Sequence, residues 1–155
     1  MIISSGHLDD PRVIDLLRFH LESMHANSPP GAMYALDLSG LKRPEVTFFA
    51  AWEDEQLLGC GALRELTASH GEIKSMRTAP GHLRKGVAAA LLRHMLGLAG
   101  ERGYRRVSLE TGSGAAFEPA IALYARFGFV KGAAFGDYIA SDFNRFFHLD
   151  LPAGV

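Results

Sequence analysis

A basic, glycine-containing turn between a strand and a helix is the part of this sequence best suited to hold an anionic ligand. The run from Met76 to Leu92 reads MRTAPGHLRKGVAAALL, in which an Ala- and Leu-rich helix opens directly behind Gly86. The first turn of a helix has N–H groups without an intrahelical partner, and the helix dipole adds about half a positive charge there. Arg84 and Lys85 add full charges, and Gly86 lets a phosphate approach the backbone closely. The turn therefore predicts a site for a phosphorylated ligand.

Two better-known phosphate loops do not fit this turn. Gly81 and Gly86 have the glycine spacing of the motif G-x-x-x-x-G-K-S/T, but Val87 and Ala88 stand where Lys and Ser or Thr are required. Without that Lys and the hydroxyl that binds magnesium, the chemistry of nucleotide hydrolysis is lost. No G-x-G-x-x-G follows an early strand, so a dinucleotide-binding fold is not indicated. From these residues alone, the remaining alternative is a strand-to-helix turn that binds nothing.

Length and composition indicate one ordinary globular domain. The chain has 155 residues, of which 48% are hydrophobic and 21% are charged, and this suits a single domain with its own core. Sixteen Lys and Arg against seventeen Asp and Glu give a formal charge of −1. This balance gives no sign of nucleic-acid binding, so no nucleic acid is expected as a partner. The seven histidines and single cysteine show no metal-ligand spacing, and no metal site is predicted.

The sequence also suggests where the protein resides. No apolar run approaches the roughly 20 residues that a membrane span needs, and the first ten residues lack the pattern of a secretory signal. A single cysteine, Cys60, excludes an internal disulfide and is typical of a reducing cytoplasm. We therefore expect a cytoplasmic protein with no membrane partner, and we interpret Cys60, in an apolar strand-like run, as a buried and inert thiol.

Hydrophobic periodicity predicts alternating strands and helices. Strands are expected over residues 2–4, 46–52, 57–66, 72–78, 106–111 and 143–151, with a further strand beginning at 129. Helices are expected from a cap at Asp9 or Asp10 to the turn at 27–31, over 84–102 and over 117–127. Residues 33–41 fit either a loop or a short helix. With no repeat or linker, a single α/β domain over residues 1–155 is the simplest organisation.

Two blocks of the sequence resemble the GNAT superfamily, the acyl-CoA-dependent N-acetyltransferases. Residues 76–80 and 84–88 are similar to the family's strand, its pyrophosphate turn (Q/R)-x-x-G-x-(G/A) and the helix behind it. Residues 120–129, AIALYARFGF, resemble the family's A-x-x-L-Y-x-x-x-G-F, and the order and separation of the two blocks agree as well. The resemblance implies an α/β (α+β) fold with a central mixed, mostly antiparallel twisted sheet and flanking helices.

Two positions depart from the family pattern. Leu83 stands where Gln or Arg usually opens the turn, so a side-chain contact is missing there, although backbone amides can still bind phosphate. Phe117 stands where the family often has an Asn that helps to seat the pantetheine arm or the acetyl end. These departures motivate an alternative function, a GNAT-like domain that binds acyl-CoA as a sensor or protein partner without catalysis.

The resemblance implies acetyl-CoA as co-substrate and assigns residues to it. The backbone of Met76 and Thr78 would pair with the pantetheine arm like an added strand. The amides of the turn and of the first helical turn would hold the pyrophosphate, at Arg84, Lys85, Gly86, Val87, Ala88 and Ala89. The implied reaction is direct transfer of an acetyl group to a primary amine of a small molecule or peptide in a ternary complex.

The same resemblance assigns a general acid. Tyr124 occupies the position of the hydroxyl that protonates the departing CoA thiolate. A thiol with a pKa of about 8.5 leaves more readily when a proton is supplied to it. Outside this block, Tyr124 would be interpreted as a core aromatic residue.

Glu72 is the predicted general base, because the attacking amine must be neutral. It lies four residues before Met76, the spacing of the catalytic Glu in histone-acetylating members of the superfamily. Strand alternation predicts that Glu72, Lys74, Met76 and Thr78 share one face. The alternatives for Glu72 are a salt bridge with a neighbour such as Lys74 or a solvated strand edge, and Glu110 is the second choice for the base.

The identity of the acceptor stays open in the sequence. It would be set by the first helix, by residues 27–41 and by the loop over residues 135–142. Three carboxylates could attract a cationic amine and are equally explained as surface charges: Asp37, Glu65 and Asp137. A homodimer is common among the proteins that the chain resembles.

Overall fold

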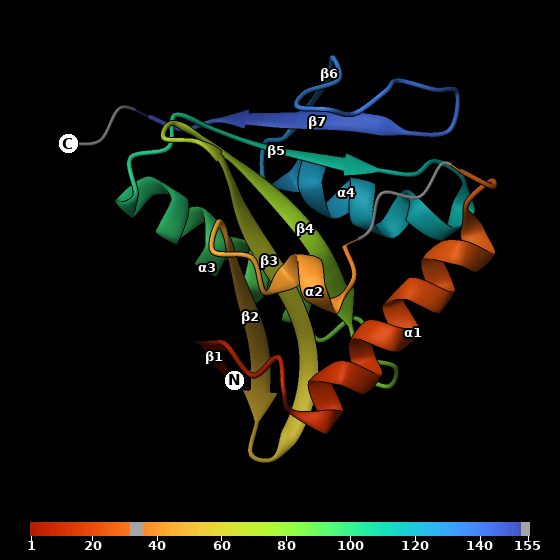
Figure 1. Cartoon of the computed structure of the whole chain (residues 1–155), viewed down its shortest axis with the longest axis vertical. Helices are drawn as coiled ribbons and strands as arrows, with labels where there is room; N and C mark the ends of the chain where they lie inside the picture. Colours follow the sequence, from red (N-terminus) through yellow and green to blue (C-terminus); the bar gives the residue numbers. More distant parts are fainter. Residues whose placement is uncertain (32–35, 153–155) are drawn as a thin grey trace.

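Seven strands form one sheet at the centre of the computed structural model, which describes residues 1–31 and 36–152 (Figure 1). The strands are β1 (Ile2–Ser5), β2 (Val46–Glu53), β3 (Gln56–Thr67), β4 (His70–Thr78), β5 (Arg106–Thr111), β6 (Val130–Gly132) and β7 (Arg145–Asp150). They lie in the order β1-β2-β3-β4-β5-β7-β6, and every neighbouring pair is antiparallel except β4 and β5. The predicted mixed, mostly antiparallel sheet is confirmed.

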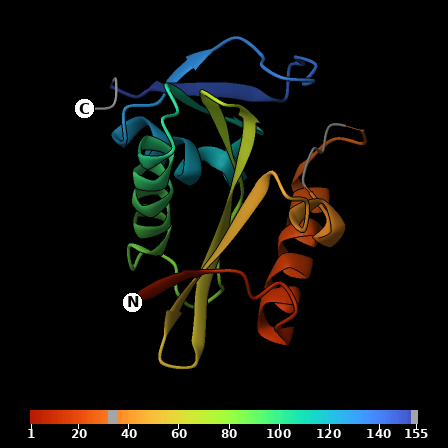
Figure 2. The ribbon, with the colours of Figure 1, turned by 60° about the vertical axis from the view of Figure 1, so that its left-hand side comes forward.

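Helices cover both faces of this sheet. On one side lie α1 (Pro11–Asn27) and α2 (Leu38–Leu41), and on the other lie α3 (Val87–Glu101) and α4 (Glu118–Arg126) (Figure 2). A 3₁₀ turn, Ala115–Phe117, precedes α4. The cap of α1 is Asp10, whose carboxylate accepts a hydrogen bond from the Arg12 amide. None of the helices in the described residues is both long and apolar enough to cross a membrane.

The helix predicted from residue 84 begins three residues later, at Val87. Arg84 and Gly86 have φ values of 63° and 81°, a left-handed conformation that cannot continue into a right-handed helix. The turn is therefore longer, and the helix shorter, than periodicity indicates. Of the ambiguous residues 33–41, positions 33–35 lie outside the described residues, and the helix α2 forms over the last four.

Each face of the sheet packs its own hydrophobic core. Buried side chains under α3 and α4 include Leu63, Ile73, Leu91, Met95, Leu109 and Tyr124. Those under α1 and α2 include Val13, Leu17, Leu41, Phe48, Cys60 and Ala62. Cys60 is buried, as predicted, and burial raises the pKa of its thiol to about 12, so the thiol stays protonated.

β4 and β5 pair over three residues only and then diverge (Figure 1). Their parallel register joins His70–Glu72 of β4 to Arg106–Ser108 of β5. Past this point, β4 keeps β3 as its neighbour on the other edge. Along the second half of β4, the edge that faces β5 therefore has no strand paired to it.

A bulge in β4 changes which way its side chains point. The register with β3 shifts between Lys74 and Arg77, where Ser75 has a φ of 55°. Lys74 lies opposite Ala62 of the α1-side core, whereas Met76 packs against the core under α3, and Arg77 hydrogen-bonds to α1. The prediction that Glu72, Lys74, Met76 and Thr78 share one face is therefore wrong, because the extra residue at the bulge reverses the alternation.

The close packing of β4 against the chain after α3 predicts a stability effect at Gly71. A Cβ there would lie 2.7 Å from Cδ2 and Cε2 of the Tyr104 ring, which is buried and whose hydroxyl donates to Glu65. Gly71→Ala should therefore lower the free energy of unfolding by about 1–3 kcal/mol, as overpacking does. Urea denaturation measures this.

A matched control is Gly97→Ala, on the exposed face of α3, where a Cβ meets nothing within 4 Å. This change should stabilise the protein by up to about 1 kcal/mol, the helix preference of Ala over Gly. Equal effects of the two substitutions would contradict the packing described at Gly71.

Candidate active site

A cleft of about 570 Å³ runs through the opening between β4 and β5. Its walls are the second half of β4, the end of β5, the inner face of α1, the turn before α3, and α4. The cleft thus reaches both sides of the sheet. It brings together three features that are far apart in the sequence, namely Tyr124, Glu110 and the turn over residues 81–86, which we call the phosphate turn after its predicted ligand.

The phosphate turn forms part of the wall of this cleft. Described residues of the turn and the first helical turn that line it are Leu83, Arg84, Gly86, Val87, Ala88 and Ala89. Gly86 is the cap of α3 and makes no side-chain capping bond, so the N–H groups of the first turn are available to an anion. Leu83 is 65% exposed and offers no polar side chain. Lys85 lies outside the wall, with its Nζ 3.4 Å from Nδ1 of His82.

Tyr124 lines the cleft from α4. It is buried, and its ring packs edge-on against Phe129 with the centroids 5.7 Å apart. Burial raises the pKa of the Tyr124 hydroxyl to about 12, while the positive charge of Arg77 opposes this shift. The hydroxyl therefore carries its proton at neutral pH and can donate it.

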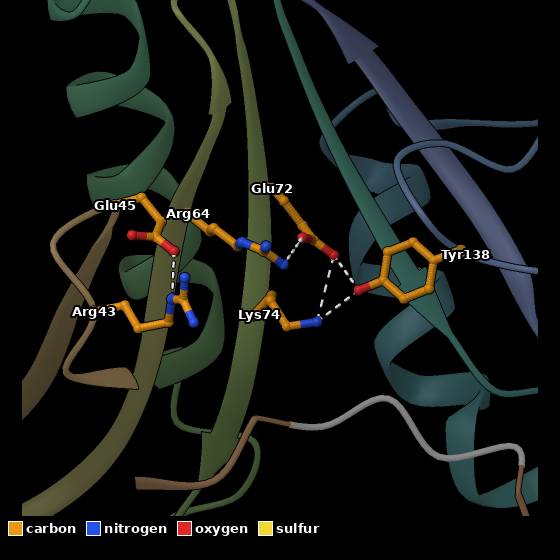
Figure 3. A network of polar contacts seen from close by, with 6 residues as sticks. All are labelled: Arg43, Glu45, Arg64, Glu72, Lys74 and Tyr138. Carbon is orange, nitrogen blue, oxygen red and sulfur yellow. Dashed lines mark hydrogen bonds and ion pairs between the residues drawn. The ribbon is translucent and has the colours of Figure 1, made fainter. Parts of the chain in front are cut away.

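Glu72 is held in a buried polar cluster (Figure 3). Its side chain is 1% exposed, and its Oε2 accepts hydrogen bonds from the Tyr138 hydroxyl and, at 3.4 Å, from Lys74 Nζ. Arg64 Nη1 lies 3.8 Å from Oε1, and Lys74 Nζ also donates to the Tyr138 oxygen at 2.5 Å. Glu72 is not among the described residues that line the cleft. The salt bridge with Lys74, one of the alternatives given for Glu72, is present.

Glu110 does line the cleft, from the end of β5. Burial raises the pKa of its carboxyl group to about 7, and the nearby charge of Glu72 raises it as well. The charge of Lys74 and a hydrogen bond from Asn144 oppose this rise. Such a carboxyl group is partly ionised near neutral pH, which is the property that a general base needs.

The cleft also contains a pair of residues, Arg77 and His20, that sequence analysis did not single out. Arg77 Nε donates to Nδ1 of His20 at 2.9 Å. His20 is buried in α1, and burial lowers the pKa of its imidazole to about 4, so the ring is neutral. Strict alternation would place Arg77 on the face opposite Glu72 and Lys74, and an ordinary Ser at position 75 gives no signal of the bulge that turns Arg77 toward α1.

The acidic residues suggested for attracting an amine lie elsewhere. Asp37 caps α2, and Glu65 accepts the hydrogen bond of the Tyr104 hydroxyl. Neither of these, nor Asp137, is among the described residues of the cleft wall. Within residues 1–31 and 36–152, no group of three or more His, Cys, Asp or Glu side chains is placed to hold a metal ion.

Comparison with known proteins finds relatives along most of the chain. Residues 13–129 match the family model described as the acetyltransferase (GNAT) family. The uncharacterised N-acetyltransferase YsnE of Bacillus subtilis (strain 168) is 53% identical over 138 residues, which cover 89% of this chain and 91% of the relative.

Solved structures share the fold. A protein from Klebsiella pneumoniae subsp. pneumoniae, assigned as an acyl-CoA N-acyltransferase, is similar with a TM-score of 0.80 and 27% identity over 97% of both chains. An aminoglycoside 6′-N-acetyltransferase in complex with coenzyme A is similar with a TM-score of 0.76 and 14% identity over 100% of both chains.

The environment of Glu110 predicts an unusual titration. In the free protein its carboxyl group should titrate near pH 7, against about 4.3 for an ordinary Glu. Lys74→Met should move the midpoint higher, because it removes the positive charge that favours the carboxylate. Carbon-13 NMR of the side-chain carboxyl groups measures both midpoints, and Glu110→Gln assigns the resonance. The control is Lys131→Met, at an exposed residue of β6. A midpoint of Glu110 near the ordinary value would contradict the burial described here.

Proposed function

The chain belongs to the acetyltransferase (GNAT) family, and we propose that it transfers an acetyl group from acetyl-CoA to a primary amine of a small molecule or peptide. The transfer is a direct attack by the amine in a ternary complex. The observation that carries the proposal is the single cleft that joins the phosphate turn to Tyr124 and Glu110. An anionic cofactor can therefore enter from one side of the sheet and an amine from the other.

Acetyl-CoA would occupy the side of the cleft nearer α3. The N–H groups from Gly86 to Ala89 and the charge of Arg84 would bind the pyrophosphate. The unpaired edge of β4 at Met76 and Thr78 would hydrogen-bond the pantetheine arm as a strand is added to a sheet. Lys85 adds positive charge beside the turn without lining the cleft. Because backbone groups make most of these contacts, Leu83 in place of a polar residue is compatible with binding.

The chemistry requires two proton transfers. The neutral amine attacks the thioester carbonyl carbon, a tetrahedral intermediate forms, and the carbon–sulfur bond then breaks. The departing thiolate takes a proton from the Tyr124 hydroxyl, which is protonated at neutral pH because burial raises its pKa. A proton released by the amine passes to a carboxylate base, so proton uptake at sulfur and proton loss at nitrogen balance.

Glu110 is better placed than Glu72 to be this base. A substrate amine can approach Glu110 from the cleft, and its pKa of about 7 allows it to accept a proton at neutral pH. Oε2 of Glu72 already binds Lys74 and Tyr138, and the residue is almost wholly buried. Glu72 remains the alternative, and substitution separates the two.

Calorimetry and steady-state kinetics of Tyr124→Phe test the proposal. The wild-type protein should bind CoA at micromolar concentration and release CoA thiol from acetyl-CoA in the presence of an amine. Tyr124→Phe should lower kcat by about 10²-fold, because it removes the proton donor, and should leave the dissociation constant of CoA unchanged. Failure to bind CoA would overturn the proposal. Equal turnover by the two proteins would remove Tyr124 from the mechanism, and binding without any turnover would favour the sensor function.

The pH dependence of kcat/KM identifies the base. In the wild-type protein kcat/KM should rise with pH through about 7 as Glu110 loses its proton. Glu110→Gln should abolish this inflection and lower the rate by about 10²-fold. Glu72→Gln should keep the inflection but move it to lower pH, because the negative charge of Glu72 raises the pKa of Glu110. The reverse pattern would assign the base to Glu72.

A further inference from the structure

Arg77 is a half-buried cation without an acidic partner. In the described part of the chain its side chain makes one hydrogen bond, from Nε to His20, and no ion pair. Two other cations on this face of β3 and β4, Arg64 and Lys74, do have an acidic partner, because both form an ion pair with Glu72. Burial lowers the pKa of Arg77, and the groups that oppose this shift are Cys60 and Tyr124 rather than a carboxylate. A partly desolvated guanidinium in this condition is a site for an anion.

His20 fixes the direction of this guanidinium. A neutral imidazole accepts the Nε–H of Arg77, and the ring of Phe19 lies 5.5 Å from the guanidinium carbon. The Nε–H is therefore occupied, and the two terminal nitrogens are left for a ligand. Two parallel N–H groups of a guanidinium match the two oxygens of a carboxylate or a phosphate.

The position of Arg77 indicates which molecule would supply the anion. Arg77 and His20 line the cleft on the side of α1, together with Ser23 and Asn27. The phosphate turn lies on the other side of the sheet, at the start of α3 (Figure 2). The Tyr124 hydroxyl nonetheless lies within electrostatic reach of Arg77 across the opening. An anion at Arg77 is therefore close to the reacting groups but separate from the pyrophosphate of the cofactor.

We propose that Arg77, held by His20, binds an oxyanion group of the acceptor, so that the acceptor is an amine that carries a carboxylate or a phosphate. The proposal rests on the acetyl transfer proposed above. Glu110 would face the amine of this acceptor, and Arg77 would face its oxyanion.

The charges of the cleft agree with such an acceptor and disfavour a polycation. Glu110 is the one acidic residue among the described residues of the wall, and it is only partly ionised near neutral pH. Four cations line the same cleft, namely Lys74, Arg77, Arg84 and Arg126. A polyamine or an aminoglycoside would bring several positive charges to a wall that is already positive, and like charges repel.

Matched pairs of acceptors test the proposal. The probes are the L-amino acids with their carboxamides, O-phosphoethanolamine with ethanolamine, and putrescine as a diamine without an oxyanion. Initial rates of CoA thiol release should give, for at least one oxyanion-bearing amine, a kcat/KM that exceeds that of its neutral counterpart by about tenfold or more. The amino acid and phosphate pairs distinguish the two sources of the oxyanion.

Arg77→Met then shows whether this residue is responsible. It should raise KM for the preferred acceptor by about tenfold or more, leave kcat within about twofold, and leave the neutral counterpart unaffected. Arg77→Lys should give an intermediate KM, because it keeps the positive charge but loses the two parallel N–H donors of the guanidinium. Arg18→Met is the matched control, at an exposed Arg of α1 that pairs with Asp15. An unchanged dissociation constant of CoA shows that each variant is folded.

The outcomes that overturn this inference differ from those that overturn acetyl transfer. A loss of kcat on every amine, with KM unchanged, would place Arg77 at the reaction centre instead. Preference for carboxamides or putrescine would also overturn it. If CoA binds but no probe is turned over, calorimetry with the protein–CoA complex tests the inference instead. An oxyanion-bearing probe should then bind to the wild-type complex and not to the Arg77→Met complex, and failure of every such probe to bind would overturn the inference. Failure of the proposed function itself appears as a failure to bind CoA, or as CoA binding without turnover of any amine.

Discussion

The short pairing between β4 and β5 is the constraint on which the site depends. Three residues of parallel register hold the two strands together, and beyond them the strands diverge. Backbone N–H and C=O groups of a strand require partners, so the open edge of β4 is a place where a ligand can pair. The same divergence lets α4 bring Tyr124 near residues on the α1 side of the sheet. A fully paired sheet would close this opening between its two faces.

The bulge at Ser75 decides which side chains of β4 face each side of this opening. It turns Met76 toward the core under α3 and Arg77 toward α1. Without it, strict alternation would point Arg77 into the hydrophobic core on the other face. The bulge thus lets one strand contribute a packing residue to the α3 side of the sheet and a cation to the α1 side.

The buried cluster around Glu72 lies beside the cleft and shares Lys74 with its wall. Two cations and the Tyr138 hydroxyl offset the cost of burying this carboxylate. Phe135, from the same loop as Tyr138, packs against the ring of His70 in β4, with their centroids 5.8 Å apart, so the loop before β7 is tied to β4. Lys74 connects the cluster with the cleft, because its charge favours ionisation of Glu110 while that of Glu72 opposes it. A group outside the cleft thereby influences the proton affinity of one inside it.

The sequence by itself determined the order of strands and helices, the position of the phosphate turn and the block around Tyr124, because these depend on residues close together in the chain. It did not determine which carboxylate lines the cleft. Glu72 and Glu110 lie on different strands, and their hydrogen-bond partners Tyr138 and Asn144 come from the loop before β7. It also missed Arg77, whose direction depends on a bulge at an ordinary Ser. Patterns of periodicity report local conformation, whereas burial, pKa and the facing of side chains depend on partners that only the tertiary structure brings together.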